Sequence, residues 1–138
     1  VNLYIHKNGI NKLTDINSSC AFFFSVTSLN NVNAENIIYI KDNDVINLNN
    51  IVIKVITTPG HTNCSVVYQI EDSMFTGDTL FNDGVGRTDL PTSNTVQLIN
   101  SLKKLLDNNN QKTIYPGHGN PSTLEEERKY NDFYRRTR

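Results

Sequence analysis

Three strand-like segments of this chain each run into a glycine-containing turn that carries a histidine or an aspartate. The turns are TPGHT (Thr58 to Thr62), TGD (Thr76 to Asp78) and YPGHG (Tyr115 to Gly119). Glycine and proline end a strand, and ligand or catalytic side chains commonly gather in turns that a rigid sheet positions. Imidazole nitrogen and carboxylate oxygen suit a divalent metal of borderline softness. His61, Asp78 and His118 are therefore predicted to form part of a metal site.

The apolar pattern predicts several strands in the first half of the chain. A strand is expected at Leu3 to His6, and Ile37 to Gly60 predicts three strands separated by an Asp-Asn turn and an Asn-rich turn. Ser65 to Ile70 and Ser73 to Asp78 flank two acidic residues like the arms of a hairpin. The first half is therefore expected to be rich in β-structure.

Two helices are predicted in the second half. Apolar residues recur at helical spacing between residues 98 and 106, with Ser93 or Asn94 available as the N-cap. A second, charged helix is expected to follow a cap at Ser122 or Thr123, with a glutamate of the TLEEE run completing a capping box, and to end near residue 130. The order of elements is several strands, helix, strand, helix.

Three further segments carry weaker patterns. Gly9 to Asp15 is a candidate short helix, AFFFSV at residues 21–26 fits a buried strand or a helix, and residues 80–91 are expected to form a long loop. No repeat appears and no linker divides the chain. Residues 1–138 are therefore interpreted as a single domain, and the absence of an initiator Met favours a natural N-terminus upstream of residue 1.

The composition excludes several classes of protein. A hydrophobic share of 37% and a net charge of −1 are typical of an ordinary globular domain and give no basic surplus for nucleic acid. The longest apolar runs are far shorter than the roughly 20 residues of a membrane helix. Cys20 and Cys64 form no CxxC pair and no disulfide framework, which favours a reducing, cytoplasmic home. Cys64 follows the TPGHT turn, but a metal-dependent reaction is favoured over a cysteine nucleophile.

The ordered string TPGHT, TGDTLF, GRTDLP and YPGHG, followed by TLEEE, resembles the metallo-β-lactamase-fold hydrolases. It is most similar to their glyoxalase-II-like thioesterase branch, the hydroxyacylglutathione hydrolases, over about residues 37–133. The resemblance implies an α/β fold, an αββα sandwich in which two inward-facing sheets lie between helices, here incomplete at its N-terminal half. It also implies a dinuclear zinc site along one edge, with iron or manganese as alternatives.

The resemblance also implies a role for individual residues. His61 corresponds to the last of three histidines on the first metal, Asp78 to the carboxylate that bridges both metals, and His118 to the last histidine on the second. Arg87 and Asp89 of the GRTD string are expected to brace the long loop beside the metals. Thr123 and Glu127 match the pattern after the last histidine and are expected to cap a helix and support the ligands from behind.

The sequence departs from the family pattern in one respect. The HxHxDH motif that supplies the remaining four ligands does not occur in these residues, and the third histidine of the chain, His6, lies in a strand-like segment without partners. His6 is interpreted as structural or exposed. An apolar sheet face that such a partial domain would leave open is expected to drive self-association.

The function that the resemblance implies is hydrolysis of a small-molecule thioester by a metal-bound hydroxide, with Asp78 as the bridging ligand. This chain is expected to be a weakly active or inactive portion of such an enzyme. The GRTD string is also similar to that of mononuclear-iron persulfide dioxygenases, which gives a second enzyme hypothesis. The third hypothesis is a non-catalytic fold that serves as a binding or structural module.

Overall fold

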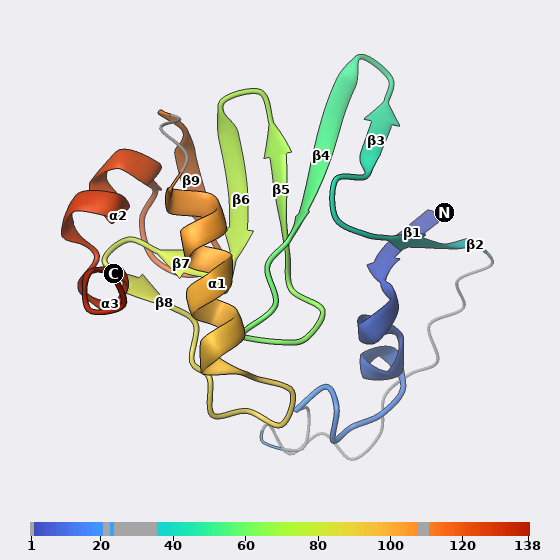
Figure 1. Cartoon of the computed structure of the whole chain (residues 1–138). Helices are drawn as coiled ribbons and strands as arrows, with labels where there is room; N and C mark the ends of the chain where they lie inside the picture. The colour runs from blue at the N-terminus through green and yellow to red at the C-terminus, as the bar shows by residue number, and fades with distance from the viewer. Residues whose placement is uncertain (1, 21–22, 24–35, 108–110) are drawn as a thin grey trace.

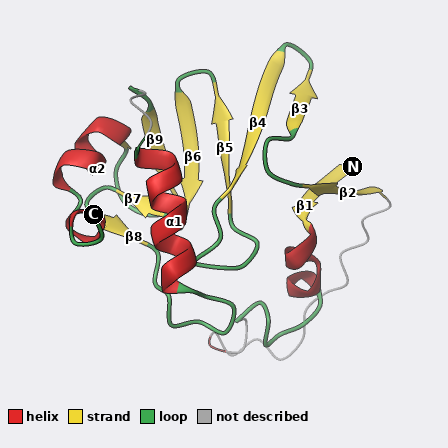
Figure 2. Ribbon diagram, viewed as in Figure 1, coloured by secondary structure: helices red, strands yellow, loops and turns green. Residues whose placement is uncertain are grey.

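The computed structural model describes residues 2–20, 23, 36–107 and 111–138 (Figure 1). Strands dominate the first half and helices the second, in the order that the apolar pattern predicts (Figure 2). In chain order the elements are β1 (Asn2–His6), the 3-10 helix η1 (Lys7–Leu13), β2 (Asn36–Ile40), β3 (Val45–Leu48), β4 (Ile51–Thr57), β5 (Val66–Ile70), β6 (Ser73–Gly77), β7 (Leu80–Phe81), β8 (Gly84–Val85), α1 (Thr95–Leu106), β9 (Thr113–Pro116), β10 (Ser122–Thr123), α2 (Leu124–Tyr130) and α3 (Asp132–Arg135).

A six-stranded sheet forms the centre of the described structure. Its strands lie in the order β10, β9, β6, β5, β4, β3, and every neighbouring pair is antiparallel except β6 and β9. The parallel pairing of β6 with β9 is made possible by the long crossover that contains α1. As a result β4, β6 and β9 all end at the same edge of the sheet, and the three glycine turns follow these ends.

One face of the sheet is covered by α1, which crosses it in Figure 1. Alternate strand residues point to this side, since successive side chains of a strand face opposite ways. They pack against the leucines of α1 and against α2 and α3. The fully or nearly fully buried cluster consists of Val67, Met74, Leu80, Leu98, Leu102, Leu105, Leu106, Ile114, Leu124 and Tyr134.

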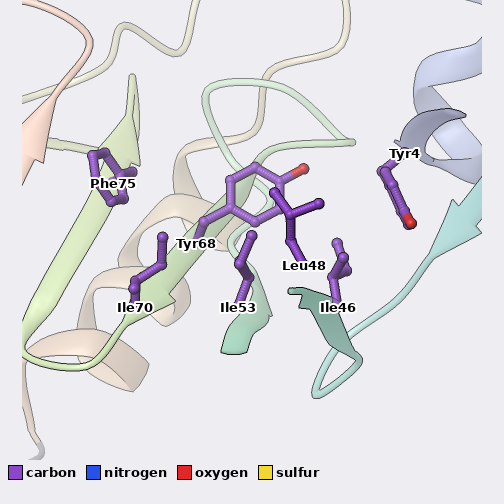
Figure 3. Close-up of a pocket in the computed structure, with 7 residues that line it drawn as sticks. All are labelled: Tyr4, Ile46, Leu48, Ile53, Tyr68, Ile70 and Phe75. Atoms are coloured by element: carbon purple, nitrogen blue, oxygen red, sulfur yellow. The ribbon is translucent and has the colours of Figure 1, made fainter. Parts of the chain in front are cut away.

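The opposite face of the sheet is apolar and open. Figure 3 shows side chains of β3, β4, β5 and β6 on this face, with Tyr4 of β1 across from them. They line a cavity of about 350 Å³, formed by Tyr4, Ile46, Leu48, Ile53, Tyr68, Ile70 and Phe75. We call this surface the open face. Leu48 and Phe75 remain 57% and 44% exposed there, so β1 and its parallel partner β2 cover it only in part.

Most predicted elements are confirmed within the described residues. The three strands expected between Ile37 and Gly60 are β2, β3 and β4, and their turns place Asn43 and Asn49 at positive φ, which asparagine tolerates. The hairpin is β5 and β6, and the helix through residue 106 is α1 with Asn94 as its N-cap. Apart from Phe23, the AFFFSV segment lies outside the described residues.

Three details differ from the expectation. The candidate helix at Gly9 to Asp15 begins earlier, at Lys7, and is a 3-10 helix. The loop at residues 80–91 contains the short hairpin of β7 and β8, closed at Asp83, which has a φ of 56°. The charged helix α2 ends at Tyr130 as expected, but it is not the last helix, because Asn131 caps a further short helix, α3. None of the described helices is long and apolar enough to cross a membrane.

Candidate metal centre

The structure brings His61, Asp78 and His118 together at the sheet edge where β4, β6 and β9 end. Oδ2 of Asp78 lies 3.5 Å from Nε2 of His61 and 3.6 Å from Nε2 of His118. Both separations exceed an ordinary hydrogen bond of about 2.7–3.2 Å. They are close to the roughly 3.4 Å that separates two ligands of a tetrahedral zinc ion with bonds of about 2.0–2.2 Å. Each distance therefore fits a pair of metal ligands, with Asp78 as one member of both pairs.

The arrangement differs from a single closed cage. Within the ranges that the structure describes, no three histidine, cysteine, aspartate or glutamate side chains lie so that they could hold one metal ion between them. The two histidines instead approach one carboxylate oxygen from separate turns. This is the arrangement expected where an aspartate is shared between two metal positions, and the assignment of the three residues as metal ligands stays a prediction.

The backbone of the first turn is fixed by α1 and by the two residues that precede it. Three successive carbonyl oxygens, those of residues 59, 60 and 61, each accept a hydrogen bond from this segment. The donors are the Ser101 hydroxyl to Pro59 (2.7 Å), the Asn94 N–H to Gly60 (2.8 Å) and the Ser93 hydroxyl to His61 (2.7 Å). The helix therefore determines where the His61 side chain begins.

Gly60 is required for this close contact. A Cβ atom at residue 60 would lie 2.4 Å from Cα of Leu98, on the backbone of α1. The φ angle of Gly60 is 153°, which side chains rarely adopt. The glycine of TPGHT thus lets the turn lie directly on the helix, which explains its place before His61.

The His61 ring is oriented by a hydrogen bond at Nδ1, the ring nitrogen that does not face Asp78. Its Nδ1 lies 2.9 Å from the carbonyl oxygen of Arg87, so Nδ1 carries the proton and donates it to that oxygen. In the neutral ring, Nε2 then presents a lone pair toward the Asp78 carboxylate at 3.5 Å. A cation between these two electron-rich groups would be attracted by both of them. A backbone carbonyl that orients a histidine in this way is typical of metal ligands.

Two glycines keep the space around Asp78 clear. A Cβ at Gly86 would lie 1.9 Å from the Asp78 main-chain oxygen and 3.0 Å from His61 Cβ. A Cβ at Gly117 would lie 2.4 Å from Asp78 Oδ1. Gly117 N–H also donates to the Gly77 carbonyl (2.8 Å), which joins the second turn to the third. Any larger residue at 86 or 117 would displace the carboxylate or its backbone.

Arg87 and Asp89 lie on the rim and do not contact the three site residues through their side chains. The guanidinium donates from Nε and Nη2 to the two Asp89 oxygens, both at 2.6 Å. The hydrogen bonds from Arg87 lower the pKa of Asp89 to about 2. Both side chains are 65% exposed, so the pair stiffens the loop from the solvent side, while the Arg87 carbonyl contacts His61.

Thr123 lies at the start of α2, and Glu127 lies on that helix. Thr123 is the N-cap of this helix, since its Oγ1 accepts a hydrogen bond from the N–H of Glu126 (3.2 Å). Glu127 is only 3% exposed, and its carboxylate accepts hydrogen bonds from the Ser122 hydroxyl, the Asp83 N–H and the Asn131 amide. Glu127 therefore ties α2 to the turn between β7 and β8.

Several residues that shape the site were not predicted from sequence. Ser93 and Ser101 hold the His61 turn, and Phe81 packs edge-on against His118 with ring centroids 5.9 Å apart and an interplanar angle of 77°. In the sequence these residues are marked only by a hydroxyl or aromatic side chain, and the group that each side chain contacts depends on the fold. His6 lies elsewhere: its Nδ1 accepts from Asn8 N–H, and burial, with Lys7 adding to it, lowers its pKa.

Comparison with known proteins assigns the family. The Metallo-beta-lactamase superfamily matches residues 35–118, more than half of the chain. The chain therefore belongs to the metallo-β-lactamase superfamily.

Relatives of this chain include proteins with and without an assigned activity. An uncharacterized protein from Mycobacterium tuberculosis is 41% identical over 101 residues, which cover 67% of this chain and 45% of that protein. The hydroxyacylglutathione hydrolase GloC of Haemophilus influenzae is 33% identical over 96 residues, with the same two coverages, 67% and 45%. The chain thus spans about half the length of these curated relatives.

Solved structures confirm the predicted fold class, an α/β metallo-β-lactamase fold. BLEG-1 B3 metallo-beta-lactamase superposes with a TM-score of 0.83 at 26% identity, over 95% of this chain and 64% of that one. TTHA1623, in a di-iron-bound form, gives 0.80 at 26% identity, over 96% and 65%. ETHE1 from Myxococcus xanthus gives 0.68 at 27% identity, over 96% and 61%. Each comparison also leaves more than a third of the longer chain outside the match.

Proposed function

We propose that His61, Asp78 and His118 belong to the metal centre of a hydrolase of the glyoxalase II type, which converts a thioester and water into a carboxylic acid and a thiol. The observation that carries the proposal is the position of one Asp78 oxygen between the Nε2 atoms of both histidines. The relationship to the hydroxyacylglutathione hydrolase of Haemophilus influenzae supports the thioester as substrate.

His61 and Asp78 have separate tasks in this proposal. His61 offers a lone pair at Nε2 because its proton is on Nδ1, where it is donated in a hydrogen bond to the Arg87 carbonyl. Asp78 places its negative charge where both imidazoles can share it. Bound divalent metals would supply Lewis-acid activation of water and polarisation of the thioester carbonyl. Zinc is the proposed metal, and iron is the alternative that the di-iron-bound TTHA1623 supports.

The proposal includes a limit on what these residues achieve by themselves. The printed sequence supplies His61, Asp78 and His118 but none of the ligands of an HxHxDH motif. The His118 side chain is 77% exposed, so little of the surrounding protein holds it. We therefore expect residues 1–138 alone to bind metal weakly and to hydrolyse thioesters slowly or not at all.

The test combines metal content with turnover. Residues 1–138 and a longer natural chain that contains them would be compared by elemental mass spectrometry and by hydrolysis of a hydroxyacylglutathione thioester. The expected result is tightly held metal and turnover in the longer chain only, with both lost in its Asp78→Asn variant. Turnover that survives Asp78→Asn would overturn the proposal.

A persulfide dioxygenase is the second candidate. It is favoured by the superposition with ETHE1, a persulfide dioxygenase, and by the GRTD string whose Arg87 carbonyl contacts His61. The two activities separate by their need for oxygen. Thioester hydrolysis that continues without oxygen supports the hydrolase, whereas oxygen consumption with a persulfide supports the dioxygenase. The third hypothesis, a non-catalytic module, would be favoured if the Asp78→Asn variant kept both its metal content and its binding partners.

A cytoplasmic location is proposed alongside this function. Cys20 and Cys64 are both free thiols in the structure. A reducing compartment keeps such thiols from pairing at random. Cell fractionation with an antibody against the chain would test this location, and recovery in an extracellular fraction would contradict it.

A further inference from the structure

The two histidines of the candidate metal centre are held in different ways. The His61 side chain is 17% exposed and its Nδ1 is bonded to the Arg87 carbonyl. The His118 side chain is 77% exposed. In the part of the chain that the structure describes, its ring contacts are the Asp78 carboxylate at 3.6 Å and the ring of Phe81. Among the described residues, no backbone carbonyl therefore plays for His118 the role that Arg87 plays for His61.

We propose that Phe81 is the positioning residue of His118, and that its edge-on ring contact replaces the hydrogen bond that orients His61. The two rings lie 5.9 Å apart at 77°, which is within the favoured range for edge-to-face aromatic pairs. Such a contact limits rotation of the imidazole about its side-chain bonds. This inference rests on the proposed function, since it assumes that His118 binds metal.

Phe81 is itself firmly anchored. It follows Leu80, which is fully buried, and it pairs with Gly84 in the β7–β8 hairpin. A Cβ at Gly84 would lie 3.8 Å from the Phe81 ring, so the hairpin's other strand lies against that ring. The Asn82 amide donates to the Pro121 carbonyl (3.3 Å), which links this hairpin to the segment that follows the His118 turn.

The hairpin is in turn fixed by α2 and α3. The N–H of Asp83 donates to Glu127 (2.9 Å), and the Asn131 amide donates both to Glu127 (2.9 Å) and to the Gly84 carbonyl (3.1 Å). Because Glu127 and Asn131 are buried, these bonds are shielded from water. The last helices therefore determine the position of the Phe81 ring, and through it the orientation of His118.

The experiment uses two measurements on the protein. In the first, the metal-free Phe81→Leu variant is compared with Phe75→Leu by the ring proton shifts of His118. Phe75 is the matched control, because its ring contacts another aromatic, Tyr115, with centroids 5.5 Å apart. Phe81→Leu is expected to shift and broaden the His118 resonances, whereas Phe75→Leu leaves them in place. Phe81→Tyr, which keeps the ring, is expected to restore the native shifts and guards against a simple folding defect.

The second measurement is the affinity for Zn²⁺ by competition with a chelating dye. Phe81→Leu is expected to weaken binding by about 3- to 10-fold, less than His118→Ala, and Phe81→Tyr to recover most of it. If His118→Ala weakens binding but Phe81→Leu does so no more than Phe75→Leu, the inference about Phe81 is overturned and the metal centre stands. If His118→Ala leaves affinity unchanged, the proposed metal centre itself is contradicted, whatever the first measurement shows.

Discussion

Nδ1 of His61 lies 2.9 Å from the main-chain carbonyl oxygen of Arg87. The two residues are far apart in sequence, and their contact sets which nitrogen of the imidazole is free to bind metal. The contact depends on Gly86, whose missing side chain allows the loop to approach both Asp78 and His61. It also depends on the turn at Gly60, which α1 holds in place.

The closeness of Gly86 to Asp78 can be tested by a single methyl group. Gly86→Ala is expected to lower the free energy of unfolding by about 1–3 kcal/mol, because the added Cβ overlaps the Asp78 main-chain oxygen. Gly84→Ala is the control, since a Cβ there meets only ordinary contacts at 3.8 Å. Thermal unfolding of both variants gives the comparison. Equal stability of the two variants would show that residue 86 is less crowded than the structure indicates.

The helix contact to the first turn is tested at Ser101. Ser101→Ala is expected to destabilise the protein by about 1–3 kcal/mol, because the Pro59 carbonyl loses its 2.7 Å hydrogen bond to Ser101, a residue that is only 4% exposed. Asn100→Ala, at an exposed position of the same helix, is the control and should change stability by less than about 0.5 kcal/mol. Denaturant unfolding measures both. A Ser101→Ala variant as stable as its control would argue against this contact.

The ion pair on the rim gives a prediction about pH. Hydrogen bonds from Arg87 lower the pKa of Asp89 from 3.8 to about 2, so the folded protein holds this proton less tightly than the unfolded chain. The stabilisation is therefore fully present above pH 4 and is lost as the pH falls toward 2. A carboxyl-detected NMR titration should place the midpoint of Asp89 near 2.

Arg87 variants separate charge from geometry in the same titration. Arg87→Gln is expected to return the Asp89 midpoint toward 3.8, while Arg87→Lys keeps the charge but loses the paired donors and should give an intermediate value. A midpoint that is unchanged in Arg87→Gln would mean that the ion pair does not persist in solution.

The open face predicts association between copies of the chain. Leu48 is 57% exposed beside a cavity lined only by apolar and tyrosine side chains, and burial of such surface is favourable by about 25 cal/mol per Å². Light scattering of residues 1–138 is expected to show concentration-dependent dimers or larger species, reduced by Leu48→Lys. Val96→Lys, at a 67% exposed position on α1, is the matched control. A monomer at all concentrations would contradict this prediction.

Local patterns were sufficient to predict most elements and the convergence of the three turns. Short apolar runs bounded by turn residues predict β4, β5 and β6, and the leucine spacing predicts α1, because each pattern depends on neighbours in the sequence. The side-chain hydroxyl of Ser101 and the ring of Phe81 could not be placed in this way. Their partners, Pro59 and His118, are distant in sequence, so the contacts exist only after the sheet and α1 have packed.

The steric role of Gly86 and Gly117 also arises from contacts with residues that are distant in sequence. Sequence alone marks Gly86 and Gly117 as turn residues, and neither has a positive φ that would require glycine. What requires glycine is the Asp78 backbone and carboxylate in the adjacent space. Such clearance depends on the distance between β6, β9 and the loop after β8, which no local pattern encodes.

The central claim is that Asp78 lies at the centre of a metal site, and Zn²⁺ titration calorimetry of two variants tests it most directly. Asp78→Asn removes the charge that lies between the two histidines, whereas Asp83→Asn removes a nearby exposed carboxylate at a positive-φ position that asparagine tolerates. Loss of a mere supporting partner of a metal ligand costs about 10- to 100-fold in affinity, so Asp78→Asn is expected to weaken binding at least tenfold. Asp83→Asn should bind zinc as the unaltered protein does. Equal zinc affinity in the two variants would contradict the account.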